Sequence, residues 1–97
     1  MTYFQSLVNT INQLKPDLKE RFGVSTIGLF GSVVRNDFSN STSDIDIIVD
    51  FSKPIGIEFI DLAEFLETKI KRKIDLVSKN GIKPKYFQQI EDEIVYV

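Results

Sequence analysis

The chain contains no cysteine, no histidine and no tryptophan. Without cysteine it has neither a disulfide framework nor a thiolate metal site, and without histidine as well a zinc centre is not expected. The same absences restrict acid–base catalysis. Any proton transfer must be carried out by carboxylates, lysine or tyrosine.

An excess of charge of one sign is also missing. The sequence has 12 Lys and Arg against 14 Asp and Glu, with a net charge of -2 and a pI near 5.0. This balance argues against binding of nucleic acid, which needs a clustered basic surface. No apolar run approaches the length of a membrane span, and the first residues lack the pattern of a signal peptide. We therefore expect a cytoplasmic protein, without membrane contact, that forms a single domain over residues 1–97.

Apolar periodicity and the positions of glycine and proline predict the secondary structure. Helices are expected over residues 3–14, 16–22, 57–70 and 84–92, with Pro16 starting the second helix and the third one well buried. Strands are expected over residues 24–30, 44–51, 73–78 and 94–97. Residues 31–36 are interpreted as one helical turn, and residues 37–43 are typical of a loop. The expected fold class is α/β (α+β), with a small mixed sheet of three to four strands flanked by helices.

Aspartates stand at the start of two of these strands. Side chains alternate along a strand, so Asp44 and Asp46 share one face near the rim of the sheet. The second and third strands are joined by about twenty residues that contain a helix, which is the length of a parallel crossover. A parallel third strand brings Asp75 to the same rim. An antiparallel first strand ends there as well, with Gly31 and Ser32.

Three carboxylates in one place repel one another. Two unit charges about 4 Å apart cost about 4 kcal/mol at an effective dielectric constant of about 20. A divalent cation neutralises such a cluster, and Mg²⁺ suits one or two carboxylates together with phosphate oxygens of a substrate. Gly31 allows close approach of the backbone, and Ser32 with the N–H groups of the following turn can bind phosphate. The combination indicates phosphoryl or nucleotidyl transfer assisted by metal.

These residues form a joint motif: a Gly-Ser pair, an arginine three residues later, a Ser-Asp-x-Asp segment and an aspartate on a later strand. The members are Gly31, Ser32, Arg35, Ser43, Asp44, Asp46 and Asp75. The motif resembles that of the nucleotidyltransferase superfamily built on the DNA polymerase β palm. Over nearly its whole length the chain is most similar to the minimal nucleotidyltransferases, antitoxin-like partners of small helical HEPN (higher-eukaryote-and-prokaryote nucleotide-binding) proteins. It departs from the usual pattern at Asn36, where glycine is common, and in a loop one residue longer before Asp44.

The resemblance implies a catalytic role for each of the three carboxylates. Asp44 and Asp46 are implied to bind two Mg²⁺ ions, and Asp75 to complete the second metal site and help deprotonate an acceptor hydroxyl. Gly31, Ser32, Arg35 and Ser43 are the implied nucleotide-binding residues. The implied substrate is ATP, whose AMP passes to a hydroxyl with release of pyrophosphate. In minimal members that hydroxyl is thought to belong to a tyrosine of the partner toxin.

Two function classes stay open. The first is an enzyme that modifies a partner protein. The second is a binding module that neutralises its partner by forming a hetero-oligomer, with little catalysis. Transfer to a small molecule of the aminoglycoside type is a third, weaker alternative, because the chain lacks an added helical region for that acceptor unless a homodimer supplies it.

Other residues have plainer interpretations. Arg35 is either a phosphate ligand or a surface cation. The basic residues of 69–73 are interpreted as cations at the end of a helix rather than as a nucleic-acid site. Tyr86, Phe87 and Ile90 are core or partner contacts rather than a stacking platform for bases.

Overall fold

The computed structural model describes residues 2–35 and 43–97, so Asn36 and most of the predicted loop lie outside the described residues. The helices are α1 (Tyr3–Phe22), α2 (Glu58–Ile70) and α3 (Pro84–Ile90), with short 3₁₀ helices η1 (Gly31–Val33) and η2 (Glu91–Glu93). The strands are β1 (Val24–Phe30), β2 (Ile45–Phe51), β3 (Ile74–Ser78) and β4 (Val95–Tyr96). They form one sheet in the order β3-β2-β1-β4, which confirms the predicted mixed sheet flanked by helices.

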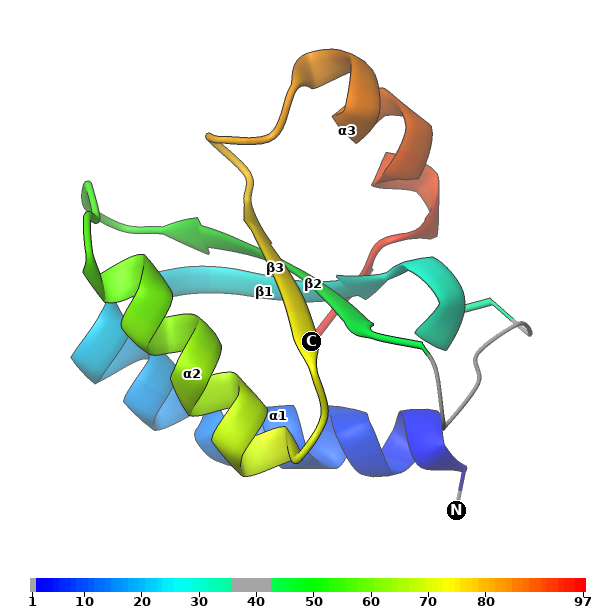
Figure 1. Cartoon of the computed structure of the whole chain (residues 1–97), viewed down its shortest axis with the longest axis horizontal. Helices are drawn as coiled ribbons and strands as arrows, with labels where there is room; N and C mark the ends of the chain where they lie inside the picture. Colours follow the sequence, from blue (N-terminus) through cyan, green and yellow to red (C-terminus); the bar gives the residue numbers. More distant parts are fainter. Residues whose placement is uncertain (1, 36–42) are drawn as a thin grey trace.

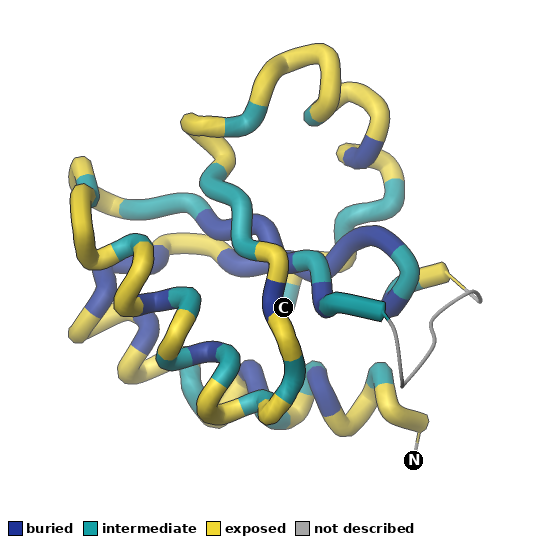
Figure 2. Tube along the Cα trace, in the orientation of Figure 1, coloured by how far each residue is buried: buried dark blue, intermediate teal, exposed yellow. Residues whose placement is uncertain are grey.

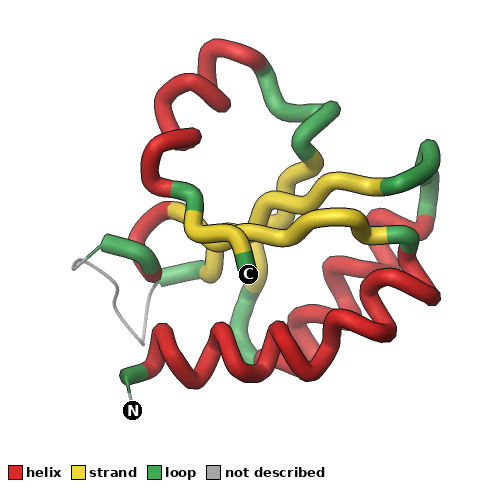
Figure 3. Tube along the Cα trace, turned by 180° about the vertical axis from the view of Figure 1, so that it is seen from behind, coloured by secondary structure: helices red, strands yellow, loops and turns green. Residues whose placement is uncertain are grey.

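The two faces of the sheet are covered differently. Helices α1 and α2 lie on one face, and α3 stands on the other (Figure 1, Figure 3). Alternation along β2 sends Ile45, Ile47 and Val49 into the main core, formed with α1 and α2. Ile48 points the other way, into a smaller cluster with Phe30 and Ile90 of α3. Because Asp46 and Ile48 are two residues apart, Asp46 lies on the α3 face of the sheet.

Helix α1 runs through Pro16 without interruption, so the prediction of two helices divided by Pro16 was wrong. A proline inside a helix removes one hydrogen bond and costs about 3 kcal/mol. Packing on both sides of Pro16 offsets this cost, since Leu7 and Ile11 before it and Leu18 and Phe22 after it are all buried. The helix also begins with a capping box between Thr2 and Gln5, which satisfies two of its first N–H groups.

Helix α2 is less buried than its apolar sequence predicts. Leu62 and Leu66 are fully enclosed in the main core, whereas Ile57 and Ile60 at the start of the helix are 75% and 59% exposed. The outer surfaces of α1 and α2 and most of α3 are open to solvent (Figure 2). Of the described helices, none combines the length and apolar character that a bilayer crossing needs.

Candidate active site

The sheet topology brings the predicted site residues to one rim. Strand β1 pairs with β2 in antiparallel register, with Phe30 opposite Asp46. Strand β2 pairs with β3 in parallel register, with Asp46 opposite Asp75. The parallel pairing of β2 with β3 confirms the prediction from the connection length, and the antiparallel pairing of β1 with β2 is the one that the predicted rim assumed. The result is a row across three strands in which Gly31, Asp46 and Asp75 are neighbours.

The chain turns sharply at Gly31, directly beside Asp46. Gly31 has φ +75°, in the left-handed region that favours glycine. A Cβ placed on Gly31 meets the carboxyl group of Asp46, at 3.0 Å from its Cγ. The 3₁₀ helix η1 starts at this turn and contains Ser32, which is partly buried. The backbone of the Gly-Ser pair therefore lies against the carboxylate row.

Burial raises the pKa of Asp46 to about 6, and the negative charge of Asp75 adds to this effect. A hydrogen bond between the Asp46 and Asp75 side chains and the charge of Asp44 raise the pKa further, while the positive charge of Arg35 lowers it. Asp46 and Asp75 are thus a close pair of like charges on facing strands. Asp75 itself is exposed to solvent, so a second molecule can reach it from outside.

Asp44 and Ser43 precede β2 rather than lying within it. The backbone oxygen of Ser43 accepts a hydrogen bond from Arg72 Nη2 at 3.1 Å, and the N–H of Ile45 donates to the oxygen of Lys73 at 3.0 Å. The segment after α2 therefore fixes the entry to β2. Sequence reasoning missed this role of Arg72, which belongs to the basic run at 69–73 that was interpreted only as the end of a helix.

A second residue that sequence reasoning missed is Glu93. Its Oε1 accepts a hydrogen bond from the Gly31 N–H at 2.9 Å, and its Oε2 lies 3.2 Å from Arg35 Nη1. The pairing of β4 with β1 explains the position of Glu93. In this pairing Gly28 lies opposite Tyr96, and Leu29 lies opposite Val95. Extending that register by two residues places Glu93 opposite Gly31. The sequence predicted the terminal strand, but only the pairing of that strand with β1 shows that Glu93 lies beside Gly31.

The apolar and aromatic residues of α3 lie in two different environments. Ile90 is buried and Phe87 packs against the small cluster on the α3 face. Tyr86 is 43% exposed. Burial raises the pKa of the Tyr86 phenol, and the charges of Asp46, Asp75 and Glu93 raise it further, so the phenol lies within the electric field of the carboxylate row.

The donor set at the rim fits a hard divalent cation. Among residues 2–35 and 43–97, no three carboxylates are grouped as a ready-made metal site. Asp46 and Asp75 are paired closely enough to share a hydrogen bond, and Asp44 acts on Asp46 through its charge. Two oxygen donors with a third nearby suit Mg²⁺ that completes its shell with water and substrate phosphate.

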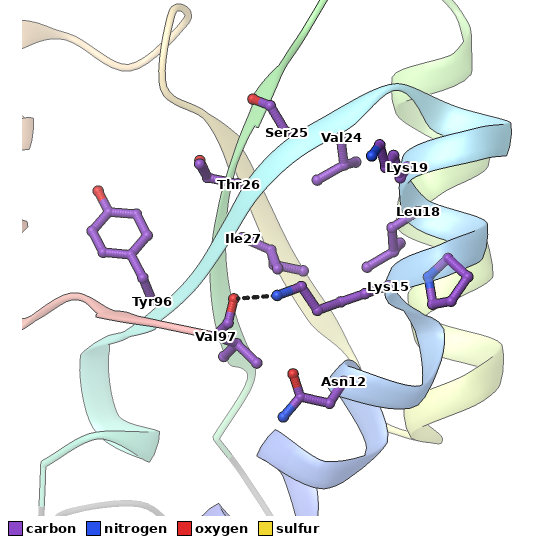
Figure 4. A pocket seen from close by; sticks show the side chains of 11 residues that line it. Asn12, Lys15, Leu18, Lys19, Val24, Ser25, Thr26, Ile27, Tyr96 and Val97 are labelled. Carbon is purple, nitrogen blue, oxygen red and sulfur yellow. Dashed lines mark hydrogen bonds between the residues drawn. The ribbon is translucent and has the colours of Figure 1, made fainter.

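A separate cavity of about 540 Å³ opens between α1, the start of β1 and the last residues of the chain (Figure 4). Lys15 crosses it, and its Nζ donates to the backbone oxygen of Val97 at 3.0 Å. The part of β1 that lines this cavity is Val24 to Ile27, at the opposite end of the strand from Gly31. The cavity is therefore not part of the carboxylate rim.

Comparison with known proteins decides the family. Residues 11–97 match the family model described as nucleotidyltransferase domain. The chain belongs to this family. It is 39% identical to the protein adenylyltransferase MntA of Thermococcus cleftensis, over 100% of this chain and 98% of that protein. It is 34% identical to a putative protein adenylyltransferase of Methanocaldococcus jannaschii, over 100% of both chains.

Solved structures agree with this assignment. The nucleotidyltransferase resembles a chain in the solved structure of a tri-AMPylated Shewanella oneidensis HEPN toxin in complex with MNT antitoxin, with a TM-score of 0.71 and 26% identity. That match covers 96% of this chain and 70% of the solved chain. A second match, to a toxin–antitoxin structure with AMP-PNP, has a TM-score of 0.69 and 29% identity, covering 84% of this chain and 64% of the other. The predicted polymerase β-like fold and the predicted family are confirmed.

Proposed function

We propose that this nucleotidyltransferase is a Mg²⁺-dependent protein adenylyltransferase that transfers AMP from ATP to a hydroxyl of a small helical HEPN toxin, and thereby acts as its antitoxin. The observation that carries the proposal is the pairing of Asp46 with Asp75 on facing strands, beside the Gly31 turn. The names of the relatives support the acceptor class, because they are protein adenylyltransferases and a toxin-bound antitoxin.

Each residue of the rim has a proposed role. Asp44 and Asp46 would hold the metal ions, and Asp75 would complete the second site. Ser32 and Arg35 bind the terminal phosphates of the nucleotide, and the Gly31 turn places the backbone for that contact. Ser43 lies at the start of the same rim, held by Arg72, and adds a polar group on the nucleotide side. Bound Mg²⁺ supplies positive charge that stabilises the developing charge on the phosphate oxygens.

The proposed chemical step is an in-line displacement. The acceptor hydroxyl oxygen forms a bond to the α-phosphorus of ATP, and the bond from that phosphorus to the bridging oxygen of the β-phosphate breaks. Pyrophosphate leaves, and Asp75 accepts the hydroxyl proton. An exposed Asp75 is suited to this task because the acceptor approaches from solvent. The acceptor then carries AMP in a phosphodiester linkage.

The decisive experiment is mass spectrometry of the toxin after incubation with this chain, ATP and Mg²⁺. We expect an added mass of AMP on a toxin hydroxyl, and its loss with a Ser32→Ala, Asp44→Ala double variant. Holding two reactants together contributes on the order of 7–11 kcal/mol in favourable cases, so we expect little transfer to water or free amino acids. An unmodified toxin in a tight complex that the variant still neutralises would establish the binding module instead.

Mg²⁺ and ATP are expected to stabilise the protein together far more than either does alone. The rim holds no ready-made group of three carboxylates in the described part of the chain, so the metal needs phosphate oxygens to complete its shell. Binding at a ligand concentration of about 100 times Kd adds about 2.7 kcal/mol to the free energy of unfolding. Thermal unfolding with each ligand alone, with both and with a chelator measures this effect. Nucleotide binding that a chelator does not change would contradict the metal roles.

A further inference from the structure

Glu93 lies beside the Gly31 turn at the rim, although it belongs to η2 near the end of the chain. Its carboxylate makes two contacts with the Gly31–Arg35 segment: it accepts from the Gly31 N–H at 2.9 Å and pairs with Arg35 Nη1 at 3.2 Å. The Glu93 side chain is 25% exposed, whereas that of Arg35 is 54% exposed. The more enclosed carboxylate is therefore the fixed partner, and the arginine is the one that it holds.

We propose that Glu93 is a positioning residue of the nucleotide site, which holds the Gly31 turn and the Arg35 guanidinium in the arrangement that receives the triphosphate. The inference rests on the proposed function, because it assumes that Arg35 contacts phosphate. Glu93 acts through Gly31 and Arg35 and does not itself contact the nucleotide.

The contact with Gly31 fixes the shape of the turn. A glycine visits many backbone conformations, so a left-handed turn at Gly31 is not held by its own sequence. The hydrogen bond from its N–H to Glu93 favours the one conformation in which φ is +75°. Ser32 follows immediately, and its place at the start of η1 depends on this turn.

The contact with Arg35 fixes the direction of the guanidinium. Arginine presents its donors in a rigid planar fork, so a carboxylate on Nη1 sets the plane in which the remaining N–H groups point. The positive charge of Arg35 also acts on Asp46, which places the guanidinium near both Glu93 and the carboxylate row. Pre-ordering a long side chain in this way reduces the entropy lost when phosphate binds.

An inhibitory role for Glu93 predicts the opposite change in nucleotide affinity. A carboxylate on Arg35 could compete with phosphate and inhibit nucleotide binding. Removing the charge of Glu93 would then tighten binding, whereas a positioning residue weakens binding when its charge is lost. The sign of the change in affinity separates the two.

The test is isothermal titration of AMP-PNP with Mg²⁺ into the full chain, comparing wild type with Glu93→Gln and Asp92→Asn. Glutamine keeps an acceptor for the Gly31 N–H but loses the charge that pairs with Arg35. We expect Glu93→Gln to raise Kd by about 2- to 5-fold. Asp92 is the neighbouring residue, and its side chain is exposed. Asp92→Asn removes the same charge as Glu93→Gln and is expected to leave Kd unchanged.

A double-variant cycle with Arg35→Ala distinguishes positioning from general destabilisation. If Glu93 acts through Arg35, Glu93→Gln has no further effect on Kd once Arg35 is alanine. An equal effect in both backgrounds, or tighter binding by Glu93→Gln, overturns the inference. Wild type that fails to bind AMP-PNP at all overturns the proposed function and the inference together. Wild type that binds while Glu93→Gln binds equally well overturns the inference alone.

Discussion

Replacing Asp46 with asparagine is expected to abolish AMP transfer and to leave the metal-free protein at least as stable as wild type. Transfer is lost because an amide cannot supply the negative charge that the proposed metal site needs. Stability is kept because Asp46 is a partly buried charge facing Asp75, with Asp44 nearby. Asparagine removes that repulsion, and its amide can still donate a hydrogen bond to Asp75.

The raised pKa of Asp46 determines how its contribution to the free energy of unfolding changes with pH. The pKa of Asp46 is raised from 3.8 to about 6 in the folded chain, so the folded state holds its proton more tightly than the unfolded state. The contribution of Asp46 to stability is therefore fully present below about pH 4 and is lost as the pH rises through about 6. At 1.36 kcal/mol per pKa unit the upper limit is about 3 kcal/mol, and solvent at this partly open site reduces it.

Thermal unfolding of the metal-free proteins at pH 7.5 and at pH 4 measures this effect. We expect Asp46→Asn to unfold at a temperature equal to or above that of wild type at pH 7.5, with any gain disappearing at pH 4. Asp50→Asn is the matched control, since Asp50 lies on the same face of β2 but at its far end, where its Oδ1 accepts from the Phe51 N–H. A large loss of stability in Asp46→Asn with transfer retained would mean that Asp46 is a structural residue.

Replacing Gly31 with alanine is expected to reduce both stability and transfer. A residue other than glycine at φ +75° costs about 1–3 kcal/mol, and the added Cβ also meets the Asp46 carboxyl. The turn and Asp46 must move apart, and a displacement of about 1 Å in a reacting group can reduce a rate about 100-fold. Chemical denaturation and the rate of AMP transfer to the toxin measure the two effects.

Gly56→Ala is the control for the Gly31 variant. A Cβ at Gly56 has only the Glu58 carboxylate within reach, at 3.7 Å, and Gly56 has no positive φ. In the double variant Gly31→Ala, Asp46→Ala the steric conflict disappears but the backbone strain stays. The stability recovered by Asp46→Ala in the Gly31→Ala background, minus its effect in wild type, therefore measures the close approach of the turn to Asp46. If Gly31→Ala behaves like Gly56→Ala, the turn does not need glycine.

The sequence was sufficient for the parallel pairing of β2 with β3 and for the juxtaposition of Asp46 with Asp75, because both follow from local rules. The length of the connection to β3 indicated a parallel pair, which places Asp75 opposite Asp46, whereas Asp44, expected on the same strand face, lies just before β2. The Gly-Ser pair followed from the end of an antiparallel β1. These inferences needed only strand boundaries and side-chain alternation.

The features that the sequence did not predict depend on contacts between distant segments. Pro16 was expected to end a helix, but burial of residues before and after it keeps α1 continuous. Arg72 and Glu93 each stand in a run of like charges, at 69–73 and 91–93, and nothing in those runs distinguishes the residue that turns inward. Only the packing of the segment after α2 and the pairing of β4 with β1 make that choice.

The sheet order has a consequence for how the protein can be divided. Read across β3, β2, β1 and β4, the rim presents Asp75, Asp46, Gly31 and Glu93, so every strand of the sheet contributes one position in or beside it. A slip of one residue in β3 would turn Asp75 toward the main core, and a missing β4 would remove Glu93. With the proposed site at this rim, we expect nucleotide affinity to depend on the register of the whole sheet. A fragment that lacks any one strand is expected not to form this site. Tight nucleotide binding would therefore indicate that every strand is correctly aligned.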